Sequence, residues 1–172
     1  MTPTDSDRVC LIESTHDQGK PACLVTWGTV RSIAAPAAVL GTARDLMAAA
    51  AGAETDVALI AGLREDLKLQ DGGVGAVLEA VRARRTPPPT PSFLRVHTVA
   101  AARTNRPLVH IGRGSMKGAL TPDEARAMAQ QWTEAAVSAQ LDVRIRYALG
   151  EWGALDPDDV DRFFTILQGL QR

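Results

Sequence analysis

Residues 20–65 read KPACLVTWGTVRSIAAPAAVLGTARDLMAAAAGAETDVALIAGLRE, and residues 106–151 read RPLVHIGRGSMKGALTPDEARAMAQQWTEAAVSAQLDVRIRYALGE. The two stretches align without a gap at a spacing of 86 positions. Identical residues recur in register, among them Pro21 and Pro107, Gly28 and Gly114, and Pro36 and Pro122. Because proline and glycine each fix the local backbone conformation, these matches indicate one structural unit written twice.

The length of the chain fits this duplication. At 172 residues it divides into two repeats, residues 1–86 and 87–172. A repeat of that size is marginal alone, so we expect the two to pack as a pseudo-twofold dimer. The proline-rich segment 86–91 favours an extended spacer between them, and its alternative is a docking motif for a proline-reading domain.

Periodicity predicts the same elements in each repeat. In the first, short apolar runs at residues 8–14, 22–27 and 29–33 are typical of strands. Pro36 opens a helix that we expect to end near Gly52, Asp56 is expected to cap a second helix, and Gly72–Gly73 precedes a third. The first repeat is therefore predicted to be a three-stranded β-meander followed by helices.

The second repeat follows the same order. Strands are expected at residues 93–99, 108–111 and 115–120, with a turn near Thr104–Asn105. Thr121 is a predicted N-cap for the helix that begins at Pro122, and Asp156–Pro157 starts the last helix. The predicted class is α+β, a tandem duplication of a three-stranded meander plus two to three helices that cover one sheet face.

Composition limits the functional classes. The formal net charge of −1 argues against general coating of nucleic acid or binding to membranes, so such a role needs a local patch. The first eight residues lack a signal-peptide pattern, and no apolar run is expected to reach the roughly 20 residues of a membrane span. We therefore expect a cytoplasmic protein without membrane contact, and the preference for arginine over lysine suggests a bacterial, GC-rich genome.

The two repeats differ most on the sheet faces that strand alternation turns outward. In the first repeat that face is expected to carry Leu11 and Leu24, and in the second His97 and His110 occupy the matching positions. Residues 92–120 contain no acidic residue, whereas the same span of the first repeat mixes both charges. The sequence therefore predicts a basic outer face on the second sheet and an apolar one on the first.

These faces are the candidate sites. The predicted anion-binding set on the second repeat is Arg95, His97, Arg106, His110, Arg113 and Lys117, and its expected partner is nucleic-acid backbone or another anion. Leu11 and Leu24 are the predicted contact with a protein partner or a second copy. The alternative is a solvated basic face and leucines covered by the neighbouring repeat. Base-stacking aromatics are missing from the basic face, which favours backbone contact over base recognition.

Residues 112–118, GRGSMKG, resemble a phosphate loop only in composition. A phosphate loop leads from a strand into a helix, whereas this stretch is expected to join two strands as a hairpin turn with a basic tip. His97 and His110 are expected to be cross-strand neighbours, but two histidines without a third ligand make a weak metal site, and no metal is predicted.

No cofactor or catalytic residue is predicted, because serine-hydrolase, metalloprotease and paired CxxC patterns are missing. The favoured function is a non-enzymatic binding or regulatory protein. One alternative is a small enzyme or small-molecule-binding protein that uses His97, His110 and Arg95 in a groove between repeats. Another is a structural or assembly protein that associates through Leu11 and Leu24.

Overall fold

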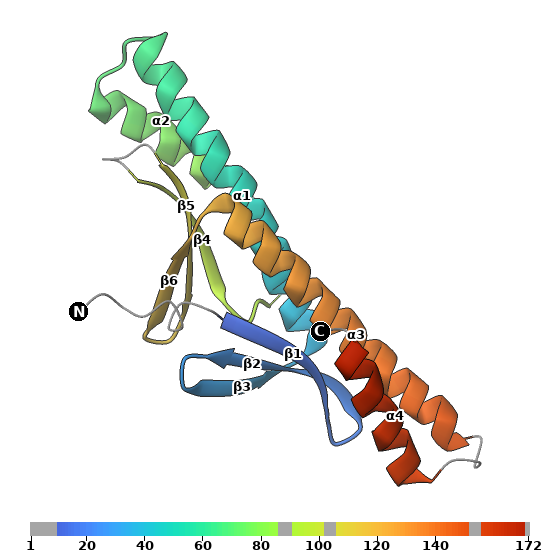
Figure 1. Ribbon diagram of the computed structural model, residues 1–172. Coiled ribbons are helices and arrows are strands. Elements are labelled where there is room, and N and C mark those ends of the chain that lie inside the picture. The colour runs from blue at the N-terminus through green and yellow to red at the C-terminus, as the bar shows by residue number, and fades with distance from the viewer. Residues whose placement is uncertain (1–9, 86–90, 102–105, 152–155, 171–172) are drawn as a thin grey trace. The chain divides into compact units, whose positions relative to one another are not determined.

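The computed structural model describes residues 10–85, 91–101, 106–151 and 156–170 (Figure 1). In this part the chain is α+β, with two antiparallel three-stranded sheets and four helices. In chain order the elements are β1 (Cys10–Asp17), β2 (Lys20–Trp27), β3 (Val30–Ala34), α1 (Pro36–Glu65), α2 (Asp71–Ala83), β4 (Arg95–Ala101), β5 (Arg106–Arg113), β6 (Met116–Leu120), α3 (Pro122–Glu151) and α4 (Pro157–Leu170). The strand orders are β1-β2-β3 and β4-β5-β6. Residues 86–90 of the expected spacer and the expected turn near Thr104–Asn105 lie outside the described residues.

Element bounds recur at the spacing seen in the sequence. Strands β2 and β3 and helix α1 each begin and end 86 residues before β5, β6 and α3. The β2–β3 register recurs as well, since Val25 pairs with Ser32 and Ile111 pairs with Gly118. Each half of the chain thus contains three strands followed by two described helices.

The first hairpin of each sheet departs from this spacing. In the first sheet Leu24 pairs with Glu13, whereas in the second His110 pairs with His97. His97 therefore occupies the place of Glu13, and the expectation that it replaces Leu11 is wrong. The physical reason is the connection: β1 and β2 are joined by a two-residue turn at Gln18–Gly19, whose φ angles are 48° and 73°, while four residues separate β4 from β5.

Helix α1 runs without the interruption expected near Gly52. Its 30 residues continue through Asp56, which is a fully buried ion-pair partner and not an N-cap. Gly52 is helical, and a Cβ there would lie 3.0 Å from Thr98 Oγ1 on β4. Glycine at this position therefore provides close approach between helix and strand and does not end the helix.

Contacts between Cα atoms divide the chain into two compact units, and each is described by itself. One unit contains residues 37–133, which include α1 from Ala37, α2, the β4–β6 sheet and the start of α3. The other contains residues up to Pro36 and from Glu134 onward, which include the β1–β3 sheet, the rest of α3, and α4. Each unit thus combines segments from both halves of the sequence. These units do not coincide with the expected repeats 1–86 and 87–172, so the repeat boundary stays a prediction.

In the unit of residues 37–133, the inner face of the β4–β6 sheet contacts α1. Thr98 Oγ1 donates a hydrogen bond to the Ala49 carbonyl at 3.4 Å, and the amides of Phe93 and Leu94 donate to Thr42 Oγ1 at 2.8 and 3.2 Å. Trp132 is fully buried, with its ring 6.0 Å from that of Phe93. Polar and aromatic contacts therefore fix the start of β4 against the helices of this unit.

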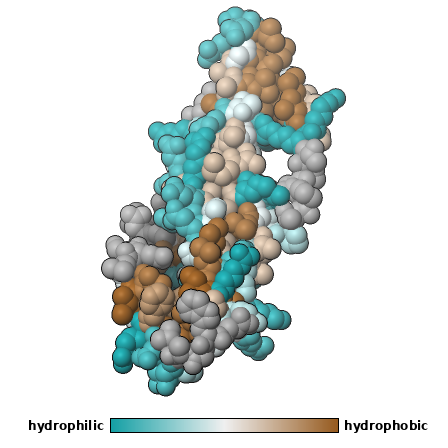
Figure 2. Space-filling model, turned by 90° about the vertical axis from the view of Figure 1, so that its right-hand side faces the viewer, coloured by the Kyte–Doolittle hydropathy of each residue, from teal (hydrophilic) through white to brown (hydrophobic). Residues whose placement is uncertain are grey.

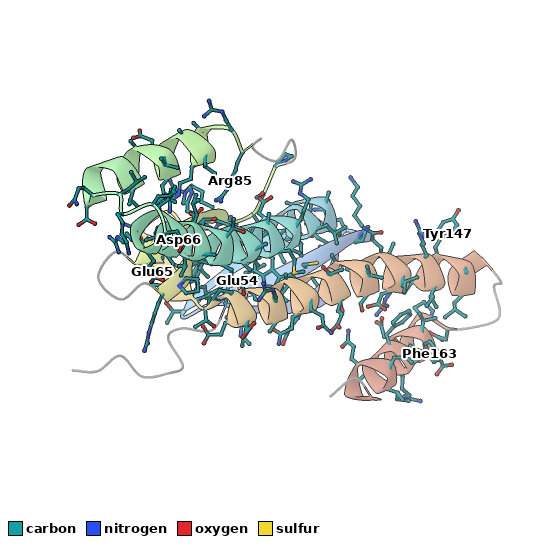
Figure 3. The ribbon with its side chains drawn as sticks, turned by 90° about the horizontal axis from the view of Figure 1, so that it is seen from above. Glu54, Glu65, Asp66, Arg85, Tyr147 and Phe163 are labelled. Atoms are coloured by element: carbon teal, nitrogen blue, oxygen red, sulfur yellow. The ribbon has the colours of Figure 1, made fainter. Side chains whose placement is uncertain are left out.

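Helix α2 folds back on α1 through an apolar cluster and a buried carboxylate. Ile60, Leu63 and Val74 form the buried centre of the cluster. Asp56 Oδ2 accepts a hydrogen bond from Arg82 Nε at 2.9 Å, and Asp56 Oδ1 accepts one from Arg85 at 2.6 Å. Figure 3 shows Arg85 where the chain leaves α2. The two arginines satisfy a charge that would be costly to bury alone.

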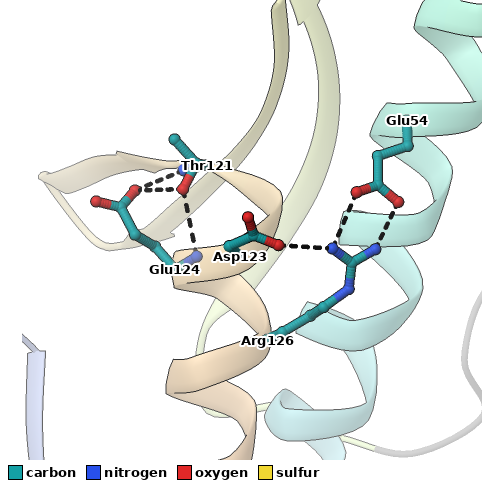
Figure 4. A network of polar contacts seen from close by, with 5 residues as sticks. All are labelled: Glu54, Thr121, Asp123, Glu124 and Arg126. Atoms are coloured by element: carbon teal, nitrogen blue, oxygen red, sulfur yellow. Dashed lines mark hydrogen bonds and ion pairs between the residues drawn. The ribbon is translucent and has the colours of Figure 1, made fainter.

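The start of α3 has the predicted cap (Figure 4). The Thr121 amide donates to Glu124 Oε2 at 2.7 Å, and the Glu124 amide donates to Thr121 Oγ1 at 3.3 Å, which is a reciprocal capping box. Arg126, one turn further on, bonds Glu54 on α1 at 2.9 Å and Asp123 at 3.1 Å. The hydrogen bond from Arg126 lowers the pKa of Glu54. This exposed bridge links α3 to α1, although ion pairs in water contribute little stability.

In the other unit, α4 lies beside the last part of α3 (Figure 1). Arg146 on α3 forms an ion pair with Asp161, and its guanidinium carbon lies 4.1 Å from the Phe164 ring centroid. Burial raises the pKa of Asp142 on α3, against the opposing effects of Arg146, a hydrogen bond with Ser14, and His16.

Tyr147 projects from α3 away from α4 (Figure 3). Figure 2 shows apolar surface at its lower end and also at its top. Among the described residues of α3 and α4, the exposed large apolar side chains are Val137, Leu141, Ile145, Tyr147, Phe163 and Ile166.

Among the described helices, α1 alone is long and apolar enough to meet the criteria for a membrane span. Its most apolar window has a mean hydropathy of 1.5, and 39% of that window is buried. The sequence-based expectation overlooked this window because it is built largely from alanine. Core helices of soluble proteins have the same composition and length, and α1 contacts β4 and α2, so the helix is weak evidence for a membrane location.

Candidate anion-binding face

The β4–β6 sheet has an outer face, turned away from α1, that carries the candidate basic residues. Alternation along β4 puts Thr98 toward α1 and therefore turns Arg95 and His97 outward. On the other strands the outward positions include Arg106 and His110 on β5 and Lys117 on β6. All five of these basic side chains are exposed. We call them the basic face.

His97 and His110 lie directly opposite each other on β4 and β5, so the prediction that they are cross-strand neighbours is confirmed. Opposed residues of an antiparallel pair have Cβ atoms about 5 Å apart, which lets both imidazoles contact one ligand. Both are exposed. Burial of these histidines would have excluded the surface-binding interpretation.

The next row of the face is formed by Arg95, Gly112 and Lys117. Gly112 on the central strand pairs with Arg95 on one side and with Lys117 on the other. Arg95 reaches the β5–β6 turn, where a terminal nitrogen donates to the Gly114 carbonyl at 3.4 Å. This contact directs the Arg95 charge toward the same end of the sheet as Lys117.

Arg113 lies apart from the other predicted residues. It pairs with Met116 and has the inward parity of Ile111 and Val109, both of which are buried. Its guanidinium carbon lies 3.4 Å from the Phe93 ring centroid, and Nη1 donates to the Phe93 carbonyl at 3.4 Å. This cation–π contact gives Arg113 a packing role. Strand alternation along β5 is the sequence feature that could have shown Arg113 to face inward and so to lie outside the basic face.

The electrostatics of the face follow from its composition. The whole span of residues 92–120 contains no aspartate or glutamate, so no carboxylate of these strands neutralises the five basic side chains. On the β1–β3 sheet, by contrast, the place of His97 is taken by the exposed Glu13. A surface of one charge sign attracts anions and raises their association rate, in a way that salt weakens.

The glycine-rich stretch 112–118 joins two strands, as expected. Gly112 and Arg113 end β5, Gly114 has a φ of 59° in the turn, and β6 begins at Met116. No helix follows, so the stacked amides of a helix N-terminus are missing from this position. The stretch is therefore a hairpin tip and not a nucleotide-binding loop.

Metal and thiol chemistry receive little support from the described residues. No group of three or more His, Cys, Asp or Glu side chains is placed to hold a metal in that part of the chain. Cys10 pairs with Trp27 and Cys23 with Ser14, so the two buried cysteines are not cross-strand neighbours. Burial raises the pKa of Cys23 to about 11, which keeps it as an unreactive thiol near neutral pH.

The outer face of the β1–β3 sheet is apolar around Leu24. Leu11 and Ile33 are 56% and 54% exposed, and half-buried Leu24 pairs with Ile33. Ile33 was missed in the sequence analysis, although its alternation with the inward Ser32 and Ala34 places it on this face. The patch formed by Leu11, Leu24 and Ile33 is interrupted by Glu13 on β1.

The fold and these faces define an α+β protein with two small antiparallel sheets, one of which presents a basic outer surface. Comparison with protein-family models, curated proteins and solved structures found no match. The functional argument therefore depends on the chemistry of the faces themselves.

Proposed function

We propose that this chain is a non-enzymatic binding or regulatory protein of the bacterial cytoplasm that contacts nucleic-acid backbone through its basic face. One observation carries the proposal: Arg95, His97, Arg106, His110 and Lys117 share one exposed sheet face that has no carboxylate of its own. Lysine and arginine on such a surface gain affinity by releasing the counterions of phosphates.

The same face favours contact with phosphates over reading of bases. Single-strand readers stack bases mainly on phenylalanine, tyrosine and tryptophan, and the outward positions of β4–β6 carry none of these three residue types. We infer from this that binding is tolerant of sequence and strongly dependent on salt.

A tandem duplication explains why only one sheet has this surface. We propose that residues 1–86 and 87–172 descend from one unit and pack with pseudo-twofold symmetry, supported by the 86-residue spacing of β2, β3 and α1 from β5, β6 and α3. Duplicated units keep their packing residues and can differ where each contacts a partner. The outer faces, with Glu13 in one and His97 in the other, are where these two differ.

Removing basic side chains from the face is expected to weaken nucleic-acid binding. Arg95→Ala and Arg106→Ala should each reduce the affinity for a labelled oligonucleotide about three- to tenfold at low salt, because each removes a charged phosphate contact. Fluorescence anisotropy with single-stranded DNA, duplex DNA and RNA measures the affinity. Equal affinity of both variants and the wild-type protein for every ligand would remove the proposal.

A second candidate function is association through the apolar patch of Leu11, Leu24 and Ile33, because two of these side chains are more than half exposed. The double variant Leu11→Ser/Ile33→Ser is expected to shift any oligomer toward monomer with little change in thermal stability, since exposed positions contribute little to the core. Light scattering coupled to size-exclusion chromatography gives the mass. A wild-type protein that is monomeric at every concentration would contradict self-association.

A further inference from the structure

Gly112 is the one outward-facing position of the central strand β5 near the histidines that has no side chain. It lies between Arg95 on β4 and Lys117 on β6, and His110 is two residues away on the same strand and face. Neighbouring strands are about 5 Å apart, so the Cα atoms of Arg95 and Lys117 are separated by about 10 Å. The outer surface at Gly112 is therefore bare backbone, with Arg95 on one side and Lys117 on the other.

The backbone does not require glycine at this position. Gly112 is not among the residues with positive φ, and an added Cβ would meet the Met116 carbonyl oxygen at 3.4 Å, which is ordinary van der Waals contact. The corresponding position of the other sheet carries Thr26, paired with Leu11 and Arg31. Glycine inside a strand costs stability and often marks a point where a ligand or another backbone approaches closely.

We propose that Gly112 is the floor of a phosphate seat, in which one phosphate group lies over the glycine between Arg95 and Lys117 and contacts His110 from the adjoining row. This inference rests on the proposed function and gives it a defined position. Arg95 uses one donor on the Gly114 carbonyl, and a guanidinium carries five. Its remaining donors, the ammonium of Lys117 and the imidazole of His110 suit a tetrahedral oxyanion.

Two sources could supply this chemistry: the phosphodiester backbone of a nucleic acid, or a free phosphate compound. The experiment uses two probes, a short labelled oligothymidylate and inorganic phosphate, each added to the whole 172-residue chain. Binding of the oligonucleotide is followed by anisotropy, and binding of phosphate by the shifts of the Gly112 and Gly114 amides in NMR spectra.

The decisive variant is Gly112→Thr, which places on the floor the residue that the other sheet has. Threonine favours strands, so the melting temperature should stay the same or rise, while oligonucleotide affinity should fall about tenfold because the side chain fills the seat. Thr26→Val, at the corresponding position of the other sheet, is the matched control and should bind as the wild-type protein does. Gly112→Ala gives a smaller obstruction if the threonine variant is unstable.

Each result separates the seat from the wider proposal. Loss of affinity in Gly112→Thr with wild-type stability supports the seat. Phosphate shifts that Gly112→Thr abolishes, without oligonucleotide binding, support the seat for a free phosphate compound and overturn the nucleic-acid function. Wild-type affinity in Gly112→Thr, with weakened binding in Arg95→Ala, overturns the seat and leaves the basic face. Binding of neither probe by the wild-type protein overturns both.

Discussion

Asp56→Ala is expected to lower the free energy of unfolding by about 3 kcal/mol or more, the usual cost of leaving a buried ion pair with one partner. The Asp56 side chain has no exposed surface, and it accepts hydrogen bonds from Arg82 and Arg85. Its removal would leave two guanidinium groups facing each other, and both are partly exposed, which keeps the cost near the lower end of the range. Urea denaturation followed by circular dichroism measures the change.

Asp142 offers a matched control, because it lies 86 residues further along the chain at the corresponding position of α3. It is half-buried, and burial raises its pKa, so its charged form is held less favourably than in the unfolded chain. Above the ordinary pKa of aspartate this disfavours the folded state, and the penalty is relieved as pH falls below the raised value. Asp142→Asn should therefore be neutral or stabilising near neutral pH, and equal losses in the Asp56 and Asp142 variants would contradict this assignment.

Trp132→Ala is expected to destabilise the protein by about 3–5 kcal/mol, the range for deleting a large buried aromatic side chain. Trp132 has no exposed surface and packs against Phe93. The Arg113 guanidinium lies over the Phe93 ring. Loss of the Trp132 side chain would open a cavity and remove the support beneath the start of β4. Thermal and urea unfolding give the magnitude.

Two milder variants separate volume from polarity at this site. The indole Nε1 of Trp132 is buried without a hydrogen-bond partner among the described residues, so Trp132→Phe loses no such bond. Trp132→Leu introduces the residue found at the corresponding position of α1, the fully buried Leu46. We expect the loss to grow from phenylalanine to leucine to alanine, and a phenylalanine variant as unstable as the alanine variant would reveal a missing polar contact.

Local signals predicted the elements of this fold well. Thr121 and Pro122 form the predicted start of α3, because an N-cap depends only on residues within one turn. The strands and their order along the chain follow from short apolar runs between turns, and the structure has both predicted three-stranded antiparallel sheets. The α+β class was therefore readable from the sequence.

The errors arose where distant residues decide the outcome. Asp56 is of a residue type that is favoured at N-caps, but it lies inside a continuous helix, where Arg82 and Arg85 pair with its charge. His97 was matched to Leu11 because the 86-residue spacing was extended beyond the aligned stretches into the first strand of each repeat. The strand pairing there is shifted, since four residues separate β4 from β5 and only two separate β1 from β2. Arg113 was counted with the basic residues, but its position in the β5–β6 ladder turns it toward Phe93. Register and ion pairing are set by tertiary contacts, which local patterns do not encode.

The most direct test of the central claim is the salt dependence of oligonucleotide binding by Lys117→Ala beside Arg31→Ala. The two residues are 86 positions apart and occupy corresponding places on β6 and β3, so both variants lose one positive charge from an outer sheet face. A phosphate contact contributes about one unit to the slope of log affinity against log salt concentration. We predict that Lys117→Ala reduces the slope by about one and that Arg31→Ala leaves it unchanged. Identical slopes for the two variants would contradict the assignment of binding to the basic face.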